Sequence, residues 1–539
     1  MADCFIIVTV NPYIELTLIY LFTFMKNVLH SYFTQKMGIK IGISILGYTI
    51  GGTIDLIAQN AKQENCRPNI VLIISDEHNG NIMGCMGDPY IHTPNLDALA
   101  ENGILFKSHY CASPISGPSR QSLTTGKYVS HHNVWGNTVG CPNDITSLPR
   151  IMQQQGYETV LTGGMKYNGL NYGWNSYKAN DGYKIAYDKK KKAGTDIAQK
   201  RERIKAGVFV NNKEDIGKEF TPMGATDMNL FTDIQRSQDA IAYIKNRAHV
   251  KQPFFLLVGL MAPHYPLQAT QELVDKYKDK IPMPKIPKGY IENLPLNYKH
   301  LRNTRKLENV PKEIVKKARE CYYARVEWAD SQIGKIIKTI NESPMADNTI
   351  IIYTSDHGEN LGEHGLWWKN CLYDCSAKVP LIISNPKRWK GKQTRSKNTE
   401  SVDLVQTIAD LGSAKVPNDW DGESMLPLLE DSTYNWKDFA ICEYYAGYIA
   451  SGITMYRQGK WKYVYHARMD ESHGPEIELY DMDNDPEELT NLARDNQYKM
   501  LIQDLHQELI CKLGEDPELI EKRYRAGAIP EAPLGIKSE

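Results

Sequence analysis

Two groups of acidic and histidine side chains each follow a short apolar run, and together they could bind a metal ion. The groups are Asp76-Glu77 after Asn69–Ile74 and Asp356-His357 after Asn348–Tyr353. Taken alone, Asp76 could simply cap a helix. If both runs are strands whose ends converge, the carboxylate oxygens form a hard site suited to Ca²⁺, or less favourably Mg²⁺, with His357 as a softer ligand.

The run from Ser116 to Gly126 reads Ser-Gly-Pro-Ser-Arg-Gln-Ser-Leu-Thr-Thr-Gly. Pro118 and Ser119 could begin a helix and nothing more. The whole run, however, resembles the maturation signature of the type I sulfatases, in which the first residue, a Cys or a Ser, is oxidised to formylglycine (3-oxoalanine) after synthesis. The resemblance therefore implies a sulfuric ester hydrolase whose modified residue is Ser116.

The chemistry explains why such a residue is needed. An ordinary serine is a poor nucleophile without an adjacent base, whereas a hydrated aldehyde has two hydroxyls, one of which a bound cation can ionise. The resemblance implies that one hydroxyl attacks sulfur and that loss of the proton from the other expels sulfate. It assigns the metal to Asp76, Glu77, Asp356 and His357, with matured Ser116 completing the ligand set.

Two details of this resemblance concern Glu77 and Arg120. Many relatives have Asp or Gln where this sequence has Glu77. Arg120 is expected to bind the metal-linked hydroxyl or to fix the carboxylates, although an arginine near a helix start could be a plain ion-pair residue.

By the same resemblance, a serine at position 116 implies a radical S-adenosylmethionine maturase as partner and an anaerobic bacterial setting.

The resemblance assigns the sulfate group to two further side chains. His264 lies in Met261-Ala-Pro-His-Tyr-Pro266, after the apolar run 254–260, and this segment resembles the family's Pro-His-x-Pro. Lys369 lies in a segment similar to the family's Gly-x-His...Lys-x-x-x-Tyr-Glu. A fixed cation beside the sulfate stabilises oxygens that stay charged through transfer. Each residue could instead be structural, as a loop histidine and a solvated lysine.

One family segment, Gly-Lys-x-His, is incomplete in this chain. The corresponding stretch, residues 156–168, contains Lys166 but no histidine. Aligned with the family segment without a gap, Lys166 stands at the position of the usual histidine. In a shifted alignment, Lys166 stands at the position of the lysine and Asn168 at that of the histidine. Lys166 is thus the leading candidate for the base that triggers sulfate release, and Lys127 and His131 are weaker candidates.

The hydrophobic pattern predicts the elements that position these residues. Apolar runs at 69–74, 254–260 and 348–353 are typical of buried strands, and the spacing at 321–337 is typical of a helix. Alternating strands and helices predict an α/β fold with a large mixed β-sheet sandwiched by helices. The resemblance adds an alkaline-phosphatase-like arrangement and a smaller C-terminal α+β subdomain with short strands at 452–456 and 461–465. We place the catalytic domain at 67–435 and the subdomain at 436–539, with an insertion at 185–225 over the active-site edge.

Composition limits the remaining possibilities. The 539 residues are 42% hydrophobic with a formal charge of -1, which predicts a globular protein without nucleic-acid partners. Residues 1–66 read as a signal or export segment, with Met37 as an alternative start, so we expect a periplasmic or cell-surface protein without a stable membrane partner. The ten cysteines lack a paired CxxC arrangement, so we expect most to be buried or individually paired, and no zinc site.

The resemblance suggests a sulfated carbohydrate of glycosaminoglycan or mucin type as substrate. Choline sulfate and aryl sulfates are alternative substrates. A phosphate or phosphonate monoester hydrolase of the same superfamily would use the same carboxylate geometry. A sulfatase-like glycan-binding protein without activity is a further alternative, because the Gly-Lys-x-His segment is incomplete.

Overall fold

The computed structural model describes residues 67–137, 140–167, 170–178, 222–446 and 449–526. The predicted export segment, Asn168 and most of the predicted insertion at 185–225 lie outside these ranges. Within the described ranges, no helix is long and apolar enough to cross a bilayer.

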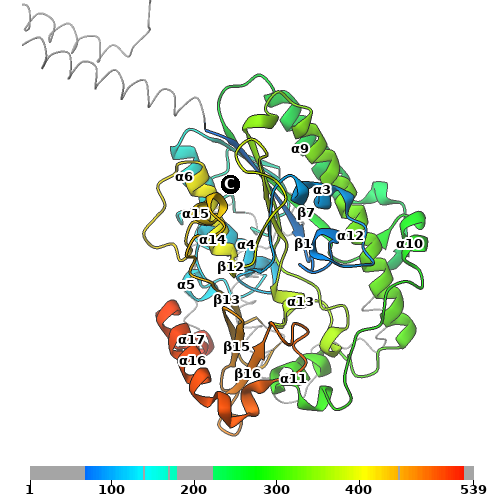
Figure 1. The fold of residues 1–539 in the computed structure, drawn as a ribbon, viewed down its shortest axis with the longest axis vertical. Helices are drawn as coiled ribbons and strands as arrows, with labels where there is room; N and C mark the ends of the chain where they lie inside the picture. Colours follow the sequence, from blue (N-terminus) through cyan, green and yellow to red (C-terminus); the bar gives the residue numbers. More distant parts are fainter. Residues whose placement is uncertain (1–66, 138–139, 168–169, 179–221, 447–448, 527–539) are drawn as a thin grey trace, which may run out of the picture. The chain divides into compact units, whose positions relative to one another are not determined.

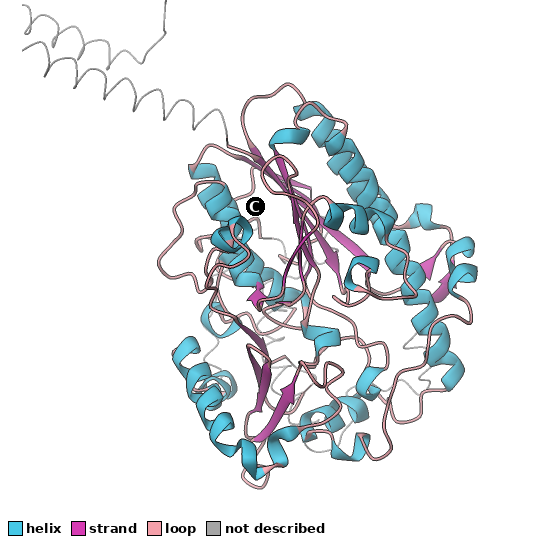
Figure 2. Ribbon diagram, viewed as in Figure 1, coloured by secondary structure: helices cyan, strands magenta, loops and turns pink. Residues whose placement is uncertain are grey.

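An eight-stranded mixed sheet is the central element of the described chain (Figures 1 and 2). The strands in spatial order are β11 (Gln393–Arg395), β2 (Ile104–Phe106), β10 (Leu381–Ser384), β9 (Thr349–Ser355), β1 (Asn69–Asp76), β7 (Phe254–Pro263), β4 (Glu158–Gly163) and β5 (Ser176–Lys178). Neighbouring strands are parallel except for the two pairs made by β10. The predicted mixed sheet is confirmed, and the three predicted strands are its central members.

Helices cover both faces of this sheet because the side chains of β1 are apolar on both faces. Ile70 and Leu72 pack with α4 (Ser116–Thr125), α6 (Leu148–Gln154) and α14 (Ser401–Leu411). Val71 and Ile73 point the other way and pack with α3 (Pro94–Glu101), α9 (Thr232–Arg247) and α12 (Lys312–Asn341). A strand buried on both faces reads as a continuous apolar run, which is why the sequence revealed it. The predicted helix at 321–337 lies within α12.

A second sheet, of four antiparallel strands in sequence order, follows near the C-terminus of the described chain. Its strands are β13 (Phe439–Tyr444), β14 (Ile453–Gln458), β15 (Trp461–His466) and β16 (Glu476–Asp481). One face packs against α16 (Lys499–Leu513) and α17 (Pro517–Arg525). The other face packs against Leu372 and Tyr373, in the segment that follows Lys369.

Shorter elements complete the described chain. They are the two-stranded sheets β3 (His109–Tyr110) with β12 (Thr399–Glu400) and β6 (Met223–Ala225) with β8 (Leu267–Ala269), and the helices α5 (Val129–His132), α10 (Gln271–Tyr277), α11 (Leu296–Thr304), α13 (Asp374–Ala377) and α15 (Leu426–Glu430). β6 occupies the end of the predicted insertion.

Lys462 of β15 lies in the interface between the C-terminal sheet and the segment after Lys369. It is fully buried, and its Nζ lies 2.8 Å from Asp374 Oδ1 and 2.5 Å from Glu488 Oε1. Burial alone would lower the pKa of Lys462, but the two carboxylates outweigh it and raise that pKa. The lysine therefore stays charged and helps hold the pKa of Asp374 below its usual value, while burial raises the pKa of Glu488 to about 8 against the opposing effect of Lys462.

Replacing Lys462 should destabilise the protein strongly. Lys462→Met leaves two buried carboxylates without their cation, so we expect a loss of about 3–5 kcal/mol in the free energy of unfolding. Lys460, which is 41% exposed and paired with Asp481, provides the control, since Lys460→Met should leave the free energy of unfolding nearly unchanged. Chemical denaturation of both variants measures this, and equal losses would contradict the inferred role.

The eight cysteines in the described ranges are all free thiols. Six are buried, Cys85 is half-buried and Cys511 is exposed. The expectation that most are buried is confirmed for these eight. The Sγ atoms of Cys111 and Cys442 approach to 3.9 Å without a bond.

Candidate active site

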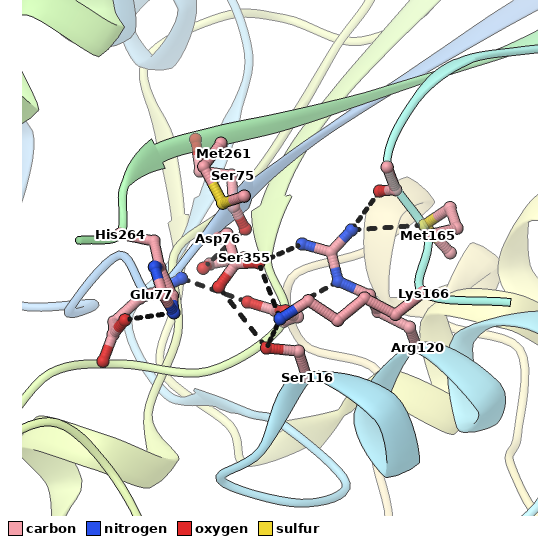
Figure 3. Close-up of polar contacts among 12 residues, drawn as sticks. Ser75, Asp76, Glu77, Ser116, Arg120, Met165, Lys166, Met261, His264 and Ser355 are labelled. Carbon is pink, nitrogen blue, oxygen red and sulfur yellow. Dashed lines mark hydrogen bonds and ion pairs between the residues drawn. The ribbon is translucent and has the colours of Figure 1, made fainter. Parts of the chain in front are cut away.

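Ser116, the first residue of α4, lies beside the carboxyl ends of β1 and β9 (Figure 3). These strands are parallel neighbours, so Asp76, which ends β1, and Asp356, which follows β9, lie at one edge of the sheet. Ser116 Oγ is 3.0 Å from His357 Nε2 and 3.5 Å from Asp76 Oδ1. All four residues are almost completely buried. The two acidic groups of the sequence thus meet around Ser116.

Arg120, one turn further along α4, joins the two aspartates. Its Nε donates to Asp356 Oδ2 at 2.7 Å and its Nη2 donates to Asp76 Oδ2 at 3.1 Å. Burial raises the pKa of each carboxyl, but neighbouring basic side chains outweigh this effect and hold both pKa values below the usual value. For Asp356 the main such side chain is Arg120. For Asp76 they are Lys166, His264 and Arg120. Arg120 therefore contacts both carboxylates directly and holds them in place.

Lys166 reaches Ser116 because the ends of β4 and β7 approach closely. Gly163 has a φ of 93°, and a Cβ at this position would overlap the backbone of Gly259, so only glycine fits. Lys166 itself adopts a φ of 51°, an uncommon conformation for a residue with a side chain. Its Nζ lies 3.2 Å from Ser116 Oγ and 3.8 Å from Asp76 Oδ2. Lys166 therefore lies within reach of the Ser116 side chain, as expected for a base acting there.

Glu77 connects the aspartates to the two side chains expected to bind sulfate. Its Oε2 lies 2.8 Å from Lys369 Nζ and 3.2 Å from His264 Nε2. Burial raises the pKa of Glu77 against the opposing effects of Lys369 and His264. Burial would lower the pKa of Lys369, but Glu77 and Asp76 raise it, so Lys369 remains a cation inside the site.

The donor set fits a hard cation. Asp76, Asp356 and His357 each offer a ligand atom within 4.8 Å of the others, and so do Asp76, Glu77 and His264. Oxygen donors predominate, which suits Ca²⁺ or Mg²⁺. Of the ligands expected from the sequence, Asp76, Asp356 and His357 therefore lie where they could hold such an ion together, whereas Glu77 groups with Asp76 and His264.

Two further residues make supporting contacts, and one of them, Glu359, was not singled out from the sequence. Glu359 is buried, and its Oε1 accepts the backbone N–H groups of Leu361 and Trp368 at 2.9 and 2.6 Å, which folds the loop before Lys369. Ser119 donates to the carbonyl oxygen of Asp356 at 2.6 Å. Glu359 follows the Asp356 group directly, so its position was a usable signal.

The two weaker candidates for the base are occupied elsewhere. Lys127 forms an ion pair with Asp419. The ring nitrogens of His131 are 2.8 Å from Asp421 Oδ1 and 2.9 Å from the carbonyl oxygen of Leu513. Proximity in the sequence did not bring them to Ser116, because α4 ends at Thr125 and the chain turns away at Gly126, in a left-handed conformation.

Comparison with solved structures reports on the fold. The chain resembles a protein solved in complex with its substrate D-glucosamine-2-N,6-O-disulfate, with a TM-score of 0.65 and 23% identity over 84% of this chain and 99% of the other. It resembles the phosphonate monoester hydrolase of Agrobacterium radiobacter to the same TM-score, with 24% identity over 83% and 96% of the two chains.

Comparison of sequences reports on the family. The arylsulfatase of Clostridium perfringens is 30% identical over 83% of this chain and 94% of its own. The choline-sulfatase of Rhizobium meliloti is 29% identical (79% and 82% covered), and the N-acetylglucosamine-6-O-sulfatase of Bacteroides thetaiotaomicron is 27% identical (84% and 87% covered). Residues 362–514 match the family described as N-sulphoglucosamine sulphohydrolase, C-terminal. Residues 68–414, which include every residue of the site, match the sulfatase family, and this chain belongs to it.

Proposed function

We propose that this protein removes sulfate from a sulfated carbohydrate of glycosaminoglycan or mucin type, using formylglycine made from Ser116 together with Ca²⁺, or alternatively Mg²⁺. The observation that carries the proposal is the position of Ser116 between the Asp76–Arg120–Asp356 cluster and Lys166. The carbohydrate class is supported by the N-acetylglucosamine-6-O-sulfatase and by the protein solved with a disulfated glucosamine.

Each side chain of the site has its own role in the proposed reaction. His264 and Lys369 bind the nonbridging sulfate oxygens. Lys369 supplies a fixed positive charge that needs no reorganisation as the sulfuryl group transfers, whereas the His264 imidazole, whose pKa is lowered by burial, contributes a hydrogen bond. Lys166 handles the proton at the Ser116 side chain, from which its Nζ is 3.2 Å away. Arg120 keeps the two aspartates ionised and correctly oriented. When bound, the cation supplies charge that lowers the pKa of the attacking hydroxyl, and the matured side chain supplies the second hydroxyl needed for release.

Lys166→Ala should lower kcat/KM for sulfate release by about 10²- to 10⁴-fold, the range typical of a lost general acid or base. Lys127→Ala is the matched control, since Lys127 pairs with Asp419 near the surface and should leave the rate within about twofold. Steady-state rates of both proteins, normalised to the fraction of converted Ser116, check this. Equal rates for the two variants would rule out Lys166 as the base.

A desulfation screen tests the substrate class. Protein coexpressed with a radical S-adenosylmethionine maturase is incubated with defined sulfated glucosamines and galactosamines, choline sulfate and an aryl sulfate. The proposal expects the sulfated sugars to be hydrolysed with the highest kcat/KM. Preference for choline sulfate or aryl sulfate would instead match the activities named for two of the relatives.

Two other readings are distinguished by simple outcomes. Glycan binding without turnover, after conversion of Ser116 is verified by mass, would indicate a binding protein without activity.

Detection of the protein in the periplasmic or surface fraction would agree with the export predicted from residues 1–66, and such a location gives access to extracellular glycans.

A further inference from the structure

β7 carries two extra residues at its carboxyl end, directly before His264. Ile74 of β1 pairs with Gly259, but Asp76 pairs with Pro263. Such a bulge bends a strand and removes backbone groups from the ladder of hydrogen bonds. Because buried N–H groups need hydrogen-bond acceptors, the backbone N–H groups in the bulge need an acceptor outside the sheet.

Asp233, in the first turn of α9, provides that acceptor. Its Oδ1 accepts the N–H of Met261 at 2.8 Å, and its Oδ2 accepts the N–H of Ala262 at 2.7 Å. The side chain is 1% exposed, and Oδ1 also lies 3.0 Å from Nη1 of Arg236. Hydrogen bonds to an ionised carboxylate are roughly twice as strong as neutral ones, so Asp233 holds both N–H groups of the bulge firmly.

The bulge leads directly into His264. The N–H of His264 donates to the carbonyl oxygens of Asp76 at 3.0 Å and Met261 at 2.9 Å. Figure 3 shows Met261 and His264 at the same end of β7, with His264 beside Glu77. Any shift of the Met261–Ala262 backbone therefore moves the imidazole relative to the place where sulfate would bind.

We propose that Asp233 is a positioning residue for His264, acting through the backbone of Met261 and Ala262. This inference rests on the proposed function, in which His264 binds the sulfate oxygens. Asp233 does not touch the reacting atoms. Its effect is to fix the distance between the imidazole and the substrate, and a misplacement of about 1 Å in such a group can cost on the order of 10²-fold in rate.

The test is a double-mutant cycle with His264. Asp233→Asn preserves the shape of the side chain but turns an NH₂ group toward one of the two backbone N–H donors. We expect kcat/KM for the sulfate ester to fall by about 10- to 100-fold in the otherwise wild-type protein. In the His264→Ala background, the same change should cost less than about twofold, because the group that it positions is already missing.

Asp330 of α12 offers a matched control. It is also 1% exposed, and its carboxylate accepts two consecutive backbone N–H groups, those of Asn95 at 3.2 Å and Leu96 at 2.8 Å. Asp330→Asn therefore breaks the same kind of contact away from His264. Its effect on kcat/KM should be the same factor in both backgrounds, which separates positioning from general loss of stability.

Hydrogen–deuterium exchange gives a second readout that does not depend on activity. Asp233→Asn should accelerate exchange of the Met261 and Ala262 amides, and Asp330→Asn should not. If the matured wild-type protein proves inactive on sulfate esters, the proposed function fails while the exchange data still report on Asp233. Unchanged exchange at these amides, or full multiplicativity of Asp233→Asn with His264→Ala, would overturn the positioning role.

Discussion

Ser116→Ala protein, coexpressed with the maturase, should release sulfate at no more than about 10⁻⁴ of the wild-type rate. The reason is chemical, since alanine has no oxygen to place 3.0 Å from His357 or 3.2 Å from Lys166 and cannot be oxidised to an aldehyde. Because the contacts of Ser116 Oγ in the described part of the chain are with Asp76, His357 and Lys166 in the site itself, the fold should be retained. Sulfate release measured by ion chromatography, alongside thermal unfolding, checks both expectations.

Ser113 provides the matched control for this experiment. It is also a buried serine in the segment that leads into α4, and its Oγ has no hydrogen-bond partner among the described residues. Ser113→Ala should therefore leave the rate within about twofold. If Ser116→Ala retained substantial activity, the assignment of the modified residue would be wrong.

The second large effect is expected from Arg120→Met. Asp76 and Asp356 are buried, and Arg120 donates to both of them. Without the guanidinium, their mutual repulsion should lower the free energy of unfolding by about 3–5 kcal/mol in chelator, and kcat/KM should fall by about 10²-fold or more. Ca²⁺ should restore part of this stability, because a cation at the same carboxylates compensates the missing charge.

The comparison that matters is the shift in melting temperature between chelator and Ca²⁺. We expect this shift to be larger in Arg120→Met than in the wild type. Arg319, which is also buried but pairs with the half-buried Glu363, gives the control, and its variant Arg319→Met should show the wild-type shift. An Arg120→Met protein whose stability does not respond to Ca²⁺ would place the cation elsewhere.

The central strands could be predicted because a strand that is buried on both faces has apolar residues at successive positions, which form a continuous apolar run in the sequence. For the same reason, the edge where Asp76 and Asp356 meet could be predicted, since parallel neighbours bring their carboxyl ends together. Ser116, Arg120 and Lys166 were found through resemblance to the sulfatases, and their convergence required the fold. The apolar pattern also located α12, although it indicated only its middle part.

Other features could not be predicted from the sequence. The bulge in β7 depends on the register between β1 and β7, and the acceptor for its N–H groups, Asp233, lies on α9, whose first-turn acid reads as an ordinary helix start. Lys462 is likewise an isolated charge in an apolar strand, and its partners are distant in the sequence, Asp374 at the start of α13 and Glu488 after β16. Such pairings are set by tertiary contacts, which local patterns do not encode.

The most direct test compares sulfate and phosphate esters with the same leaving group. Matured protein is assayed on 4-nitrophenyl sulfate, 4-nitrophenyl phosphate and a phenylphosphonate monoester, while the mass of the Ser116 peptide gives the fraction converted to formylglycine. We predict that kcat/KM is highest for the sulfate ester and that the rate rises in proportion to the converted fraction. A higher kcat/KM for phosphate or phosphonate, or full sulfatase activity with unconverted Ser116, would contradict the account.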